Sequence, residues 1–261
     1  MGSDGGSASD AGAPSPPKPP ESESVRAAVV DWQELMLRAT GSGPPDFTAA
    51  TAAQATAAAE KHARASALRS LERGIGTVRL TDSQTVSDVL PSSGAAEKIG
   101  QALGDYRITA KRYFSDHGVE LDVEVPLPPI ADLLLAPATV PTKAPGPKSK
   151  SSGLIIDARG LNVVPALAPR LVDQNGKEVY GIASLSAEAR HRAGVVAYAK
   201  AIADAKASQR VGEKPLMVKA SKAVGPDLVL SAAAVRAIEE SNPVYLLDGR
   251  VLIVSGPPAK R

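Results

Sequence analysis

The stretch that decides the fold is SGLIIDARGLNVVPALAPRLVDQNGKEVYG, residues 152–181. Residues 154–158 form an apolar run that predicts a buried β-strand. Residues 170–181 predict a β-hairpin, because an Asn-Gly turn lies between two short apolar runs. The turn is either a two-residue type I′ connection at Asn175 and Gly176, or a type I turn over Asp-Gln-Asn-Gly with Gly176 in the bulge position. Either turn determines how the two hairpin strands pair.

The rest of the chain alternates predicted helices and strands. Residues 25–39 predict a helix with one apolar stripe, residues 48–73 a long alanine-rich helix, and residues 95–103 a third helix. Residues 106–114 and 119–127 predict a β-hairpin around a Ser-Asp-His-Gly turn. The elements expected after the quoted stretch are a helix over 186–208, a strand over 214–224, a helix over 231–240 and a closing strand over 250–255.

This order of elements predicts the α+β fold class, because helices and strands are interspersed in both halves. We expect two small units, each with helices packed on an antiparallel sheet. The predicted organisation is a disordered Pro/Ser/Gly-rich tether at 1–24, a first α+β domain at 25–135, a Pro/Lys-rich linker at 136–152, a second α+β domain at 153–256 and a tail at 257–261.

The composition excludes several classes of function. A net charge of +2 and an aromatic content of 3% argue against nucleic-acid binding. Cysteine is absent, which excludes disulfides, thiolate metal sites and cysteine nucleophiles. No stretch approaches the ~20 apolar residues of a membrane-spanning helix, and residues 1–20 lack the apolar core of a signal peptide. We therefore expect either a cytoplasmic protein or one whose leader has been removed.

Asp157 and Arg159 are the main candidates for a functional site. The two residues are two positions apart on the expected strand, so their side chains point to the same side of the sheet. They form either a polar recognition site or a structural ion pair that anchors the following loop. We favour the structural interpretation, because the sequence places no nucleophile or general base beside them. Asn175 and Gly176 are expected to serve the hairpin turn.

The other polar residues form no catalytic or metal-binding pattern. The three histidines lack the spacing of metal ligands, and no Gly-x-Ser-x-Gly motif is present. The alternating Glu120, Asp122 and Glu124 predict cross-strand ion pairs rather than paired catalytic carboxylates. Their candidate partners are Arg107, Lys111 and Arg112. We expect no catalytic residue, no metal ligand and no cofactor.

Several segments share their patterning with one known family. The segments are ATGSGPPD (39–46), AEKHARASALRSLERGIGTVRLTD (59–82), YRITAKRYFSDHGVELDVEVPL (106–127), GLIIDARGL (153–161) and PALAPRLVDQNGKEVYG (165–181). They resemble the Lpp-twenty family of bacterial envelope lipoproteins, and more closely its longer relatives that carry the Asp-Ala-Arg-Gly block. The segment AGVVAYAKAIADAKASQRVGEKPLMVKA (193–220) is also similar to those relatives. The resemblance covers residues 32–254.

The resemblance implies a secreted, often lipid-anchored protein of the periplasm or outer membrane. Some relatives are flagellar accessory proteins that form rings or disks, and the family brings no established catalytic residue. The acylated cysteine of a lipoprotein is not in this chain, so an outer-membrane contact would need an anchor that the chain does not carry.

We therefore predict a non-enzymatic structural or assembly protein of the bacterial cell envelope. It would oligomerise or dock on an envelope or flagellar-type motility machine, with copies of itself and other envelope proteins as partners. The alternative is a glycan- or small-molecule-binding envelope module, or a hydrolase, with a pocket near Asp157 and Arg159.

Overall fold

The computed structural model describes residues 27–135 and 149–257. These residues form seven α-helices and two β-sheets, so the predicted α+β class is confirmed. The predicted tether at 1–24 and most of the predicted linker and tail lie outside the described residues. The predicted domain boundaries therefore stay a prediction.

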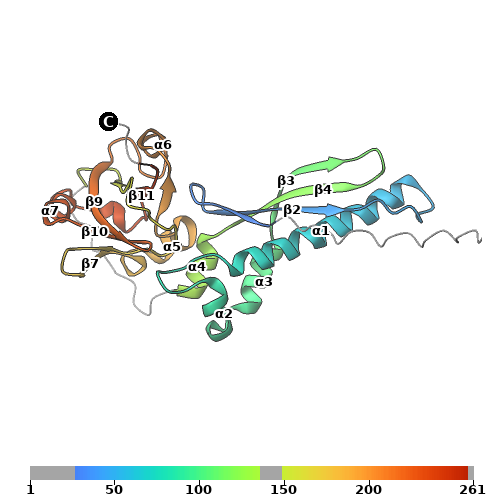
Figure 1. The fold of residues 1–261 in the computed structure, drawn as a ribbon, viewed down its shortest axis with the longest axis horizontal. Coiled ribbons are helices and arrows are strands. Elements are labelled where there is room, and N and C mark those ends of the chain that lie inside the picture. Colours follow the sequence, from blue (N-terminus) through green and yellow to red (C-terminus); the bar gives the residue numbers. More distant parts are fainter. Residues whose placement is uncertain (1–26, 136–148, 258–261) are drawn as a thin grey trace, which may run out of the picture.

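The first unit is a four-stranded antiparallel sheet with the strand order β1-β2-β4-β3. Its strands are β1 (Val29–Asp31), β2 (Met36–Gly43), β3 (Arg107–Tyr113) and β4 (Val119–Pro126). The long helix α1 (Ala52–Gly76) runs along one face of this sheet (Figure 1). Three shorter helices lie at the end of the unit that faces the second unit (Figure 1). They are α2 (Val86–Ser93), α3 (Ala96–Gly104) and α4 (Pro128–Leu135).

Small residues allow α1 to lie unusually close to the sheet. Ala59, Ala63 and Ala67 of α1 have no exposed surface, and they face the glycines of β2. A Cβ atom at Gly41 would lie 2.1 Å from the Ala63 carbonyl oxygen, and one at Gly43 would lie 1.8 Å from the Ala59 carbonyl oxygen. The alanine-rich helix thus packs by close backbone contact, which explains why it contains so few large apolar side chains.

The second unit is a seven-stranded mixed sheet with the strand order β7-β6-β10-β9-β5-β11-β8. Its strands are β5 (Leu154–Asp157), β6 (Leu171–Val172), β7 (Glu178–Tyr180), β8 (Ala197–Ala199), β9 (Leu216–Val224), β10 (Asp227–Leu230) and β11 (Val251–Val254). Strands β9, β5, β11 and β8 are parallel neighbours, so this sheet is mixed rather than purely antiparallel. Its helices are α5 (Ala187–Ala193), α6 (Ile202–Ala207) and α7 (Ala232–Glu240), with the short 3-10 helices η1 (Ile182–Ser184) and η2 (Val244–Leu246).

Many of the predicted elements are confirmed. The first predicted hairpin is β3–β4, and His117 takes the positive φ of 69° that its turn requires. The predicted strand at 154–158 is β5, which is fully buried at Leu154 and Ile156. The Ser231 hydroxyl caps α7 by accepting a hydrogen bond from the Ala234 N–H at 3.2 Å.

The predicted helix at 25–39 is wrong, because this segment is the β1–β2 hairpin. Buried residues recur every second position along β2, at Leu37, Ala39, Gly41 and Gly43, which is the period of a strand. The apolar residues of the short strand β1 and of the turn after it happen to follow helical spacing, although neither segment is helical. Leu35 in that turn has a φ of 53°, outside the helical region.

The predicted helix at 186–208 is also wrong, because it contains α5, strand β8 and α6. Gly194 takes a φ of 67° and ends α5 after two turns. The apolar residues that follow then add to the sheet as β8, parallel to β11. A segment with good helical spacing thus becomes an edge strand, because β11 offers it a row of unpaired backbone groups.

The two units contact each other through hydrogen bonds and an ion pair. The backbone N–H groups of Leu167 and Ala168 donate to the carbonyl oxygens of Arg79 and Leu80 at 3.0 and 2.8 Å. A buried arginine of α5, Arg190, contacts Asp132 of α4 with an N–O distance of 2.9 Å. No helix among residues 27–135 and 149–257 has the length and apolar character to cross a membrane.

Candidate functional site

The turn of the β1–β2 hairpin is docked against β8, the edge strand of the second sheet. The Tyr198 N–H donates a hydrogen bond of 3.0 Å to the carbonyl oxygen of Trp32. The two aromatic rings meet edge to face, with centroids 5.6 Å apart and planes at 78°. This is a favourable geometry for an aromatic pair, so the first unit covers the edge of the second sheet by specific contacts.

Tyr198 is fixed from its other end as well. Its buried hydroxyl donates to the Ala166 carbonyl oxygen and accepts from the Ala166 N–H, both at 3.0 Å. Burial raises the pKa of this phenol above its usual range, so Tyr198 stays protonated at physiological pH. Tyr198 therefore holds the loop that carries Pro165 as well as the hairpin turn.

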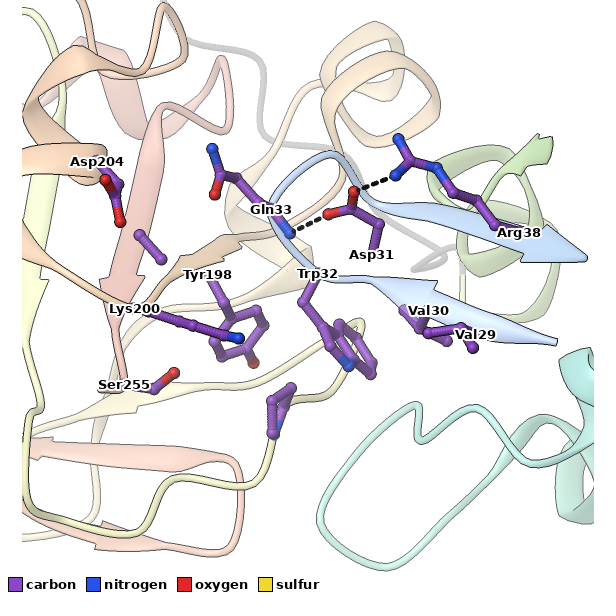
Figure 2. Close-up of a pocket in the computed structure, with 12 residues that line it drawn as sticks. Val29, Val30, Asp31, Trp32, Gln33, Arg38, Tyr198, Lys200, Asp204 and Ser255 are labelled. Carbon is purple, nitrogen blue, oxygen red and sulfur yellow. Dashed lines mark hydrogen bonds and ion pairs between the residues drawn. The ribbon is translucent and has the colours of Figure 1, made fainter. Parts of the chain in front are cut away.

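A pocket of about 540 Å³ lies between the hairpin and the second unit (Figure 2). The hairpin contributes Val29, Val30, Asp31, Trp32, Gln33 and Arg38. The second unit contributes Pro165, Tyr198, Ala199, Lys200, Asp204 and Ser255. Ala199, the last residue of β8, and Ser255, the residue after β11, line this pocket. The pocket is therefore at the carboxyl ends of two parallel strands, where α/β sheets commonly bind ligands.

Two of the charged residues that line the pocket neutralise each other. Asp31 pairs with Arg38 at 2.9 Å, and its other carboxylate oxygen accepts the N–H groups of Gln33 and Glu34 at 3.0 and 3.1 Å. These bonds shape the turn and hold Trp32 in place. Asp31 and Arg38 are thus part of the wall of the pocket.

Four other polar side chains have no such partner. Within the part of the chain that the structure describes, no hydrogen bond or ion pair occupies the side chains of Gln33, Lys200, Asp204 and Ser255. Lys200 extends from the end of β8 in the direction of Trp32 (Figure 2). The pocket thus combines two aromatic walls with one amide, one ammonium, one carboxylate and one hydroxyl group, which can donate and accept hydrogen bonds to a ligand.

Asp157 and Arg159 form a local ion pair outside this pocket. The Arg159 Nε and Nη2 atoms both donate to the Asp157 carboxylate at 2.8 Å, and the Arg159 N–H donates to it at 3.2 Å. The Arg159 guanidinium holds the pKa of Asp157 below its usual range. Arg159 and Asp157 are only two residues apart in the sequence, so their hydrogen bonds hold the backbone in a turn just after β5. Its role stays a prediction.

Asn175 and Gly176 lie in the turn between β6 and β7. In the sheet, strands β10 and β9 separate β6 from β5, the strand that ends at Asp157. The Gly176 N–H donates to the Asp173 carbonyl oxygen at 3.1 Å and Gly176 has a φ of 81°. This is the type I turn with a bulge glycine, the second of the two predicted alternatives.

The acidic residues of β4 form the predicted cross-strand ion pairs. Glu124, which is 4% exposed, pairs with Arg107 of β3, and Asp122 pairs with Arg112 at 2.6 Å. Lys111 differs from the prediction, because it pairs with Glu60 of α1 at 2.8 Å. No group of His, Cys, Asp and Glu within residues 27–135 and 149–257 has the geometry of a metal site.

The fold and the pocket define a two-unit α+β protein with a candidate ligand site between its units. Residues 153–257, less than half of the chain, match the family described as Treponema pallidum Tp0624, second domain. No curated protein matches the chain. The predicted resemblance to the Lpp-twenty family is wrong, because the match in the second half is to the Tp0624 domain family and no Lpp-twenty family matches. Short shared motifs and patterning were too unspecific to identify the family.

Proposed function

We propose that this protein is a non-enzymatic binding protein that takes a small polar ligand in the pocket between its two units. The observation that carries the proposal is that four polar side chains without a protein partner line one pocket together with two fixed aromatic rings. Gln33, Lys200 and Asp204 are exposed and Ser255 is partly exposed. Because none of the four side chains has a partner among the described residues, all four are available to a ligand that enters the pocket.

The size and composition of the pocket suit a ligand of one or two residues or sugar rings. Ligand pockets commonly enclose roughly 300–1,000 Å³ and combine apolar walls with a few placed polar groups. Here Trp32, Tyr198 and Pro165 supply the apolar walls, and the polar groups come from both units. A ligand would thus contact both units at once. The alternative of a pocket near Asp157 and Arg159 stays a prediction: neither residue lines this pocket, although Asp157 pairs with Val254, the residue before the lining residue Ser255.

Ligand binding is expected to change the emission of Trp32, the single tryptophan of the chain. We would titrate the protein with a panel of amino acids, dipeptides, monosaccharides and oligosaccharides. A saturable change in fluorescence is expected for at least one compound, because the ring lines the pocket. Ser255→Leu is expected to weaken the change, because the larger apolar side chain takes up part of the pocket and removes the hydroxyl group, whereas Lys206→Leu, on an exposed position outside it, should have no effect. If neither fluorescence nor saturation-transfer NMR responds to any compound, the proposal is wrong.

A second candidate function is self-association as an assembly protein of the cell envelope. Phe47, Tyr113 and Phe114 are 85%, 56% and 50% exposed, and they include both phenylalanines of the chain. Gly43 and Tyr113 both pair with Val119, so the loops that carry the two phenylalanines lie at the same end of the first sheet. We call Phe47, Tyr113 and Phe114 the distal tip, because this end points away from the second unit (Figure 1). Exposed aromatic clusters of this kind favour protein contacts.

If the distal tip mediates assembly, light scattering at high protein concentration is expected to show a dimer or larger species. The double variant Phe47→Ser/Phe114→Ser should then return the protein to a monomer, because it removes most of the exposed apolar surface of the tip. Val164→Ser changes a residue that is 43% exposed in the second unit and serves as the control. A monomer in the unmodified protein, with no partner recovered from envelope fractions, would reject this second function.

A further inference from the structure

The pocket continues into a second hollow on the side of α6. This hollow has a volume of about 490 Å³ and shares Gln33 and Asp204 with the first pocket. Gln33 belongs to the hairpin turn and Asp204 to the first turn of α6. The two hollows thus form one groove, which we call the hairpin groove, between the β1–β2 turn and α6.

The charges of the hairpin groove that remain without a partner differ between its two parts. Lys200 lines only the first hollow, Glu34 lines only the second, and Asp204 lines both. Within the described residues, the side chains of these three residues take part in no ion pair or hydrogen bond. The groove therefore has one free ammonium at its aromatic end and two free carboxylates toward its other end.

The remaining charged groups of the groove are already used inside the protein. Asp31 pairs with Arg38 at 2.9 Å. Arg210 lines the second hollow, but its guanidinium donates to the carbonyl oxygens of Ala193, Gly194 and Val251 at 2.6–2.9 Å. A ligand would therefore find Lys200, Asp204 and Glu34 as the available charges.

We infer that the hairpin groove binds an amino acid or short peptide that carries both a carboxylate and an ammonium group. This inference rests on the proposed function and names its ligand class. The ligand carboxylate would pair with Lys200, the ammonium with Asp204 and Glu34, and the apolar stem would lie against Trp32 and Tyr198. A neutral sugar could bond to the same groups, but it would leave the separated charges without counter-charges.

The first test compares the dipeptide Ala-Leu, which has one ammonium and one carboxylate group, with three chemically blocked forms of it. Binding is followed by the fluorescence of Trp32, as above. Amidation of the carboxylate and acetylation of the α-amino group are each expected to weaken binding about twofold to fivefold, the effect of removing one exposed ion pair. The doubly blocked form should bind weakest, and added salt should reduce the differences between the four forms.

The second test assigns each end of the ligand to a residue. Lys200→Met should bind the free and the amidated dipeptide equally, because the residue that distinguishes them is gone. Asp204→Asn and Glu34→Gln should likewise reduce the difference between the free and the acetylated forms. Lys206→Met and Glu213→Gln change exposed charges outside the groove and should leave both differences intact.

The outcomes separate this inference from the proposed function. If oligosaccharides change the Trp32 emission while the four dipeptide forms bind equally or not at all, the ligand class is wrong and the binding function stands. If Lys200→Met weakens the free and the amidated dipeptide by the same factor, the assigned orientation is wrong. If no compound of either class produces a response, both the inference and the proposed function are wrong.

Discussion

Replacing Gly41 by alanine is expected to lower the free energy of unfolding by about 3 kcal/mol, because β2 and α1 are in backbone contact at this glycine. A Cβ atom at Gly41 would lie 2.1 Å from the Ala63 carbonyl oxygen and 2.4 Å from the Ala67 nitrogen. Both atoms belong to the backbone of α1, so no side-chain rotation can relieve the contact. The helix must move away from the sheet, and the apolar contacts on both sides of Gly41 loosen with it.

Gly100→Ala is the matched control for this variant. Gly100 lies within α3, and a Cβ atom there would meet nothing within 4 Å. Alanine has a higher helix propensity than glycine, so this variant should gain about 0.5–1 kcal/mol. Urea unfolding followed by far-ultraviolet circular dichroism measures both changes. Equal effects of the two substitutions would mean that α1 and β2 are not as close as the structure places them.

Replacing Arg210 by methionine is expected to lower the free energy of unfolding by about 3 kcal/mol, because three backbone segments bond to its guanidinium. Its nitrogen atoms donate to Val251, Ala193 and Gly194 at 2.8, 2.6 and 2.9 Å. Burial lowers the pKa of Arg210 to about 10, because removal from water disfavours the charged form. Three charge-assisted hydrogen bonds, of about 1.5–3 kcal/mol each, outweigh this cost of burial.

The structural change caused by Arg210→Met is expected to reach the pocket. The carbonyl groups of Ala193 and Gly194 end α5, immediately before the chain enters β8 and reaches Tyr198. Arg192→Met is the control, because the Arg192 side chain is 70% exposed and, within the described residues, pairs with Glu188, whose side chain is 82% exposed. It should change stability by less than about 0.5 kcal/mol. If urea unfolding gives the same midpoint for both variants, the three hydrogen bonds contribute no net stability.

The pocket could not be predicted from the sequence. Trp32 and Tyr198 are 166 positions apart in the sequence. Each fits an apolar stripe with helical spacing, so the sequence predicts a helix at both positions. The structure places Trp32 in a hairpin turn and Tyr198 on an edge strand, where the two rings meet. Lys200, Asp204 and Gln33 lie in polar surroundings without a motif. Only the docking of one unit on the other brings them together.

Local patterns determined much of the rest. The apolar run at 154–158 and the Asn-Gly turn predict β5 and the β6–β7 hairpin, because both signals lie within a few neighbouring residues. The type of turn was compatible with two geometries, and the structure decides between them. The long alanine-rich helix and the β3–β4 hairpin follow for the same reason, as does the helix that Ser231 caps. The α+β class is the sum of these local requirements.

The tertiary structure decided the segments whose patterns were compatible with two structures. Short runs such as 29–43 and 195–199 have apolar residues that fit both a helix and a strand, and the partner that is available settles which forms. For the first run that partner is β4, which pairs with β2 along its whole length. For the second it is β11, beside which β8 completes the sheet and turns Tyr198 toward the hairpin. The sequence by itself determined the elements with local signals, and contacts between distant segments determined the sheet edges and the groove between them.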